Sequence, residues 1–186
     1  MKKFIICAIC LFASYSSFAQ IHMDKVEEDG SRIIITSSKN IYKGWLNAAA
    51  VCLVYATLPE QEYETIELSL TLNEGKMQFD KGRKLLLKFN DGSIMELSNS
   101  EHIGPTDYTY AVTSEGTDYY THPRYPITKE QITEIVRKEV VKIRIENNVG
   151  YFDREIKRNK FSDAIMTLYK AIYIRKQTNN NVYNNF

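Results

Sequence analysis

Cysteine and histidine are scarce in this chain. The 186 residues include three cysteines, and the histidines are His22, His102 and His122. Two of the cysteines lie in an N-terminal segment that we expect to be removed, so Cys52 alone would remain and no disulfide could form within the chain. Its apolar surroundings, AAAVCLVYA, are typical of a cysteine that packs as a small hydrophobic side chain. No G-x-S-x-G or S-x-x-K motif accompanies the histidines, so the sequence offers no pattern for nucleophilic catalysis.

A basic excess and a long apolar run are also missing. The chain has 24 Lys and Arg against 23 Asp and Glu, and loss of Lys2 and Lys3 with the N-terminal segment leaves 22 against 23, a net charge of −1. Nucleic-acid-binding domains normally carry a basic excess, so we expect no nucleic-acid partner. Past the N-terminal segment, no apolar run reaches the roughly 20 residues of a membrane-spanning helix. The glycines stand singly at turns, so we expect no phosphate-cradling loop and no cofactor.

The first nineteen residues, MKKFIICAICLFASYSSFA, have the pattern of a secretory signal peptide. Two lysines precede a ten-residue apolar run from Phe4 to Ala13, and the small residues Ser17 and Ala19 predict cleavage after Ala19. The two cysteines of this segment follow isoleucines inside the apolar run, which argues against lipidation. The sequence therefore predicts export, to the periplasm or the extracellular space.

The remaining pattern is mostly that of β-strands. The segment ETIELSLTLNEG alternates Ile66, Leu68, Leu70 and Leu72 with polar residues, which predicts a half-buried antiparallel strand. Hairpin turns are expected at 29–30, where Asp-Gly favours a type I′ turn, at 90–92, and near 115–116. The continuous apolar run AAAVCLVYATL favours a buried strand over a short helix, because β-branched and aromatic residues are frequent in it.

Helical signals appear only in the last third of the chain. Thr128 and Gln131 form a capping box, with Ile127 and Ile132 at the positions of a hydrophobic staple, and predict a short helix at about 129–138. VVKIRIE then returns to strand periodicity. A long amphipathic helix is predicted by apolar residues at helical spacing: Phe161, Ile165, Leu168, Tyr169 and Ile172.

These patterns predict one α+β domain at 20–178, after the signal peptide at 1–19 and before a flexible, Asn-rich tail at 179–186. We expect an antiparallel β-sheet or sandwich built from hairpins, followed by a short helix, a strand and a C-terminal amphipathic helix.

Tyrosines gather in the predicted hairpin that ends at DYYTHPRYP. At strand periodicity Tyr108 and Tyr110 share one face, Tyr119 and Tyr125 share another, and an aligned register would join the two pairs into an aromatic platform. Arg124 and His122 could add hydrogen bonds to a sugar or peptide held there. Tyrosine is also frequent in strands for structural reasons, since aromatic cross-strand pairs stabilise hairpins, and this interpretation stays open.

An enzymatic alternative depends on two histidines. Five polar residues flank the same hairpin, and pairing of its strands could bring some of them together: Glu101, His102, Asp107, Asp118 and His122. Their spacing matches no metal-ligand motif, so we assign no metal and no catalytic residue. A small exported hydrolase or metal-dependent enzyme using His102 or His122 remains the alternative function. The sole tryptophan, Trp45, either fills an edge of the core, which is the interpretation we favour, or is exposed for binding.

The signal ending SFAQ, the small size, and the order of hairpins, YPIT helix, strand and helix are similar to those of uncharacterised small exported proteins of Gram-negative bacteria. The resemblance implies an exported location and carries no catalytic residues. We therefore expect a non-catalytic binding or structural module of the cell envelope, whose partner is an envelope protein, a glycan or a peptide.

Overall fold

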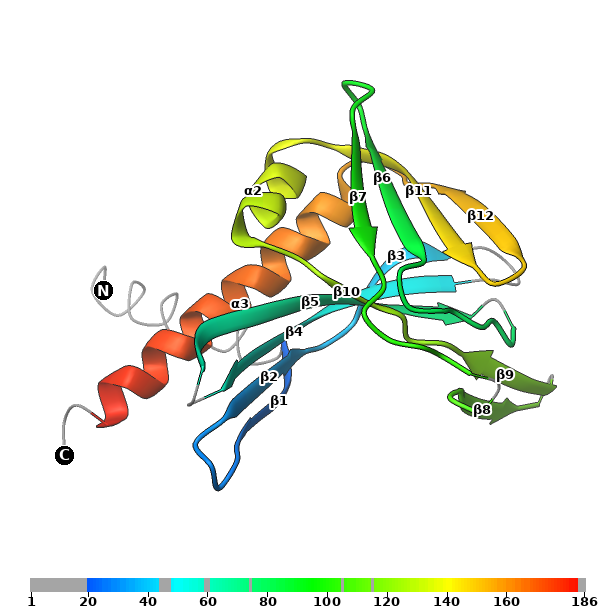
Figure 1. Ribbon diagram of the computed structural model, residues 1–186. Coiled ribbons are helices and arrows are strands. Elements are labelled where there is room, and N and C mark those ends of the chain that lie inside the picture. Colours follow the sequence, from blue (N-terminus) through cyan, green and yellow to red (C-terminus); the bar gives the residue numbers. More distant parts are fainter. Residues whose placement is uncertain are drawn as a thin grey trace, which may run out of the picture.

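A computed structural model describes most of the chain outside the expected signal peptide. The described residues are 20–43, 48–58, 61–73, 75–104, 106–114 and 116–183. Within them the chain forms twelve strands and two helices, most of the strands in two antiparallel sheets (Figure 1). The expected α+β class is confirmed. The signal peptide and Trp45 lie outside the described residues.

The larger sheet has six strands, in the order β1-β2-β4-β5-β10, with β3 beside β4. Its strands are β1 (Ile21–Val26), β2 (Arg32–Thr36), β3 (Lys39–Lys43), β4 (Ala48–Leu58), β5 (Gln61–Asn73) and β10 (Arg124–Pro126). The longest pairing is that of β4 with β5, which runs from Ala48 opposite Asn73 to Leu58 opposite Gln61. The apolar run AAAVCLVYATL is thus a strand, as expected.

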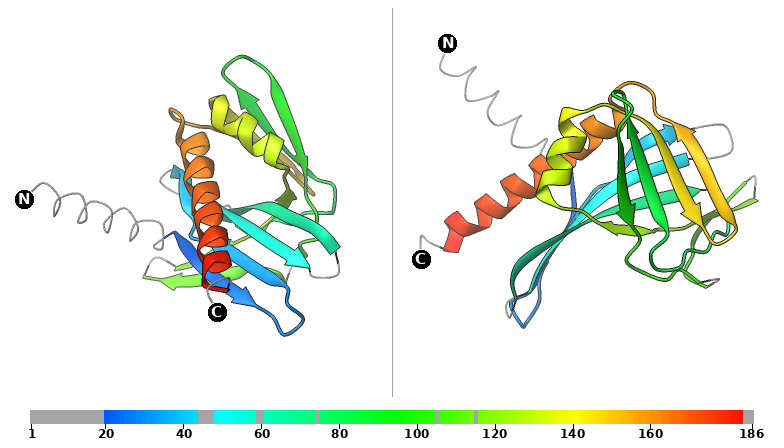
Figure 2. Two further views of the ribbon diagram at one scale, coloured as in Figure 1. Left: turned by 90° about the vertical axis from the view of Figure 1, so that its left-hand side faces the viewer. Right: turned by 45° about the horizontal axis from the view of Figure 1, so that its top comes forward.

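The smaller sheet has four strands, in the order β12-β11-β6-β7. Its strands are β6 (Lys84–Phe89), β7 (Ile94–Ser98), β11 (Val140–Asn147) and β12 (Gly150–Glu155), and a separate two-stranded sheet consists of β8 (Thr109–Thr113) and β9 (Gly116–Tyr120). After β7, the amide of Ser100 donates to the carbonyl of Arg124 in β10 at 2.9 Å, which links the two main sheets along one side. The second view of Figure 2 shows the smaller sheet lying across one side of the larger one.

The core lies between the two sheets and the helices. The alternating residues of β5, from Ile66 to Leu72, are 0–6% exposed and join a single hydrophobic cluster with the inward residues of β4, β6 and β11. The short helix α2 (Lys129–Arg137) begins as expected: the Thr128 hydroxyl accepts from the amide of Gln131, whose side chain accepts from the amide of Thr128.

The long helix α3 (Lys160–Tyr183) packs against α2 and the strands β2, β3, β4 and β11 (Figure 2). Phe161, Ile165 and Leu168 are fully buried on its inner face, as their spacing predicted. The helix continues to Tyr183, five residues into the segment expected to be a flexible tail. No helix in the described part of the chain is both long and apolar enough to span a bilayer.

The turn at Asp29-Gly30 differs from the type I′ turn expected. Gly30 has φ of 82°, but Asp29 is not among the described residues with positive φ. The amide of Gly30 donates to the carbonyl of Glu27, and the amide of Glu27 donates to the carbonyl of Ser31. This pattern is a type I turn followed by a left-handed glycine in a bulge, the usual three-residue hairpin loop. Of these two residues, only Gly30 therefore occupies a position that needs glycine.

Two strands were not expected from the sequence. β3 and β12 are short, their sequences KNIYK and GYFDRE alternate poorly, and β12 lies at a sheet edge with mostly exposed or half-buried side chains. Edge strands bury too few side chains to leave a strong period-two pattern, so pairing with β4 and β11 decides their conformation.

Candidate functional site: the tyrosine hairpin

The hairpin β8–β9 brings three of the candidate tyrosines together. Tyr110 lies directly opposite Tyr119 in the antiparallel register. Tyr108 is two residues before Tyr110, and its ring meets that of Tyr119 edge-on, with the centroids 6.4 Å apart and the planes at 73°. An edge-on arrangement of this kind is favourable for aromatic quadrupoles. We call Tyr108, Tyr110, Tyr119 and the exposed Val112 of the same face the tyrosine surface.

The tyrosine surface is open to solvent. All five residues of β8 are exposed, with Tyr110 69% and Val112 76% exposed. The hairpin lies beside the end of β5 and reaches away from the rest of the larger sheet (Figure 1). From the loop after β5, the ammonium group of Lys76 lies 4.4 Å from the centroid of the Tyr119 ring, a cation–π contact that orients the ring.

His122 anchors the base of the hairpin. Its Nδ1 is 3.2 Å from the hydroxyl of Thr71 in β5, and its Nε2 is 2.7 Å from the hydroxyl of Thr109 in β8. Desolvation by burial, assisted by the positive charge of Arg124, lowers the pKa of His122 below its usual value. A neutral ring with both nitrogens bonded to threonines acts as a connector between sheet and hairpin.

Arg124 and Tyr125 do not join the tyrosine surface. The guanidinium of Arg124 lies 3.3 Å from Glu101 and 4.0 Å from Glu67. Tyr125 is 0% exposed and faces the core opposite Leu68 of β5. The expectation that Tyr125 shares an accessible face with Tyr119 is therefore wrong, because the chain leaves the hairpin after Tyr120 and β10 turns its alternate residues into the core.

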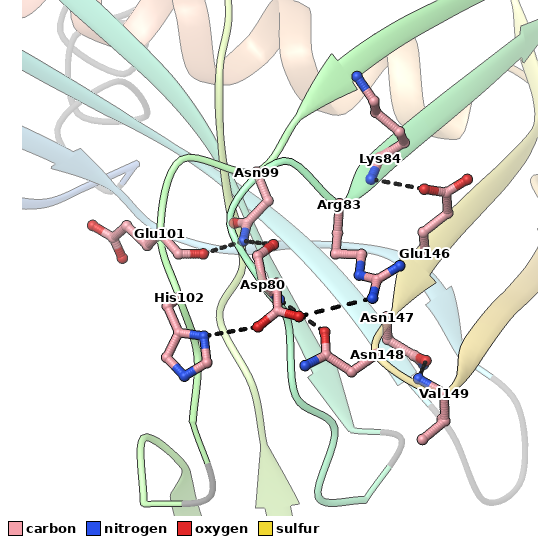
Figure 3. Close-up of polar contacts among 10 residues, drawn as sticks. All are labelled: Asp80, Arg83, Lys84, Asn99, Glu101, His102, Glu146, Asn147, Asn148 and Val149. Atoms are coloured by element: carbon pink, nitrogen blue, oxygen red, sulfur yellow. Dashed lines mark hydrogen bonds and ion pairs between the residues drawn. The ribbon is translucent and has the colours of Figure 1, made fainter.

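The second candidate histidine, His102, belongs to a different cluster. Its Nδ1 is 3.1 Å from Asp80, while the amide of Asp80 donates to the side chain of Asn148 at 2.8 Å (Figure 3). Asn99 donates to the carbonyls of Asp80 and Glu101. These contacts fasten the loops that follow β5, β7 and β11 to one another.

The acids and histidines that flank the hairpin contact different partners. His102 contacts Asp80, and the carboxylate of Asp107 accepts from the amide of Gly104. Within the described residues no three side chains of the metal-ligating types lie close enough to hold an ion.

Several recesses on the surface lie away from these histidines. One, of about 210 Å³, is lined by Leu86, Lys88, Ile94, Lys142 and Arg144 on the outer face of the smaller sheet. Another, of about 130 Å³, lies between α3 and the start of β5 and includes Tyr55, Glu64 and Lys176. These two are smaller than the roughly 300–1,000 Å³ usual for small-molecule sites. Two larger recesses, of about 380 and 520 Å³, are wide open to solvent and lie along α2, where Lys129 and Glu130 line both.

Sequence reasoning missed the residues that hold the hairpin in place. Thr71, Lys76 and Thr109 contact His122 or Tyr119 from outside the tyrosine cluster. No motif marks them, and only the register of β9 beside β5, fixed by the bridge between Leu72 and Thr121, places them there.

Comparison of the chain with protein-family models, with curated protein sequences and with solved structures gave no significant match. The functional interpretation therefore depends on the geometry of the chain itself.

Proposed function

We propose that this protein is an exported, non-catalytic binding module of the cell envelope that holds a glycan on its tyrosine surface. The observation that carries the proposal is Tyr110, which lies opposite Tyr119 and yet is 69% exposed. A ring that served only to stabilise the hairpin would gain by covering itself, since burying apolar area is favourable by about 25 cal/mol per Å².

The chemistry of the surface fits a sugar. Three phenol rings offer flat apolar faces for the CH groups of a pyranose, and their hydroxyls can donate to and accept from sugar hydroxyls. The rings are held by the cross-strand pairing and by Lys76, so little side-chain entropy is lost on binding. The surface is shallow, which suits an extended chain of sugars that contacts several rings.

Export supports the same interpretation. The pattern of residues 1–19 predicts secretion, and glycans of the envelope are the polymers that such a protein would meet. The location is part of the proposal and is tested by fractionating cells that express the protein.

The binding test is a titration of the purified protein with peptidoglycan fragments and oligosaccharides, followed by calorimetry and by NMR shifts of the tyrosine rings. One aromatic contact contributes about 0.5–1.5 kcal/mol beyond its area, so Tyr110→Ala and Tyr119→Ala should each weaken binding roughly 2- to 10-fold. Tyr151→Ala is the matched control, because Tyr151 is 61% exposed and lies on β12 in the four-stranded sheet, away from the hairpin.

Equal affinity of the wild type and both hairpin variants would refute the proposal, as would the absence of binding to every glycan. Binding of extended peptides alone would move the proposal to the peptide partner. If the protein bound no ligand at all, the tyrosines would be explained by aromatic cross-strand pairs that stabilise the hairpin.

A further inference from the structure

No described strand pairs with the outer edge of β8. β8 has β9 as its one neighbour in a two-stranded sheet, and all five of its side chains are exposed. An isolated two-stranded hairpin is at best marginally stable in water. This one is held to β5 through β9 and His122, and a further strand on its other side would stabilise it more. The outer edge of β8 therefore offers backbone hydrogen-bonding groups to another strand, and pairing with that strand would stabilise the hairpin.

Two other edges among the described strands, β1 and β12, are protected, and β8 is not. β1 carries Asp24 and Lys25 and has a register irregularity between Ile21 and Met23. β12 carries Asp153, Arg154 and Glu155 in sequence. Charges and bulges of this kind prevent strands of other molecules from adding to an edge. The sequence of β8, TYAVT, has no charge and no proline, and its pairing with β9 is regular.

We propose that two copies of this chain associate through their β8 strands, antiparallel and with a two-fold axis at Ala111. This register places Tyr110 of each copy opposite Val112 of the other, and Thr109 opposite Thr113. The strand is thus self-complementary: its two most exposed apolar side chains form an aromatic–β-branched pair twice, a combination that favours antiparallel pairing. A two-fold axis closes the assembly at a dimer.

The charges of the two hairpin strands allow this pairing. Ala111 lies opposite Asp118 within its own hairpin, so among the residues of β8 and β9 the nearest charges across the axis are the two Asp118 carboxylates. They are separated by three strand spacings, about 14 Å, which exceeds the screening length of about 8 Å at physiological ionic strength. Their repulsion is consequently weak.

Edge pairing leaves the faces of the hairpin free. Directly opposed residues lie on the same face, so the tyrosine surfaces of the two copies become one four-stranded surface. The association requires no ligand and does not depend on glycan binding. Five residue pairs form a small interface, so the dimer should be weak and depend on concentration.

Sedimentation equilibrium of the ligand-free protein, at concentrations up to about 1 mM, measures the association. Ala111→Lys should weaken it at least tenfold, because two ammonium groups would face each other across the axis. The same lysine lies opposite Asp118 within its own hairpin, so the hairpin itself is maintained. Val149→Lys adds the same charge at a position that is 95% exposed in the β11–β12 turn and should leave the dimer unchanged.

Disulfide trapping identifies the surface. In a Cys52→Ser background, Ala111→Cys should give a covalent dimer under mild oxidation at concentrations where Val149→Cys does not. A wild-type protein that stays monomeric throughout the concentration range would overturn the proposal. So would a dimer that Ala111→Lys leaves intact or that Ala111→Cys fails to trap, since it would use another surface.

Discussion

Removing the hydroxyl of Tyr125 should stabilise this protein. Tyr125 is 0% exposed, and its hydroxyl has no hydrogen-bond partner among the described residues. Burial, together with the negative charge of Glu146, raises the pKa of this phenol, so the group stays neutral at ordinary pH. A buried polar group without a partner costs about 1–3 kcal/mol of stability.

Tyr125→Phe keeps the ring, which fills the core opposite Leu68, and deletes only the oxygen. We expect the free energy of unfolding to rise by about 1 kcal/mol, after allowance for the small void that the oxygen leaves. For a domain of this size that is a rise of about 2–4 °C in the midpoint of thermal unfolding. Urea unfolding monitored by circular dichroism gives the free energy directly.

The control is Tyr55→Phe. Tyr55 is 3% exposed, but its hydroxyl donates to Glu64 at 3.0 Å. Loss of that bond should lower the free energy of unfolding by about 1 kcal/mol, because Glu64 keeps its lysine partners. Opposite signs for the two substitutions would support the reasoning. Destabilisation by 1 kcal/mol or more in Tyr125→Phe would refute it, since it would mean that the hydroxyl has a partner in solution.

Two further substitutions test the electrostatics and the helix start. The hydrogen bond from Lys176, opposed by burial, lowers the pKa of Glu64 to about 2 from its usual 4.5, so its stabilising effect is complete above pH ~4.5 and is lost as the pH falls towards 2. The pKa shift sets an upper limit of roughly 3 kcal/mol on the stabilisation by ionised Glu64, and 32% exposure of the side chain reduces it to about 1–2 kcal/mol. Glu64→Gln should therefore destabilise the protein at pH 6 but hardly at pH 2. An equal loss of stability at both pH values would contradict this. Thr128→Ala removes the cap of α2 and should cost about 1 kcal/mol in urea unfolding. Thr133→Ala, within the same helix, should cost little, because alanine is the better helix former, and equal costs would argue against capping.

The positions of the hairpin turns at Gly30 and Gly92, and the capping box, could be predicted from sequence because their causes are local. Gly92 lies at a position with φ of 86°, which only a few residue types adopt at low cost, and Asn90-Asp91-Gly92 marks it directly. The Thr128 and Gln131 side chains bond to backbone amides three residues away. Neither feature requires another part of the chain.

The candidate site could be predicted only in part. Strand periodicity predicted one face for Tyr108 and Tyr110, while the register that pairs Tyr110 with Tyr119 comes from the structure. Periodicity also placed Tyr125 there, and it is buried. The error arises because a period of two holds only while the strand continues, and the chain departs from β8 after Tyr120 to pair with β5.

By itself the sequence determined the α+β class, the strands of the core and the start of α2. These features depend on apolar periodicity and on hydrogen bonds between residues that are close together in the sequence. The tertiary structure decided which strands lie at edges, where His102 and His122 find their partners, and which tyrosines meet solvent. Those features depend on contacts between residues far apart in the chain, such as Thr71 with His122 and Asp80 with His102. Their geometry exists only after the sheets have packed, because the register of each strand is fixed by its neighbours and the core beneath.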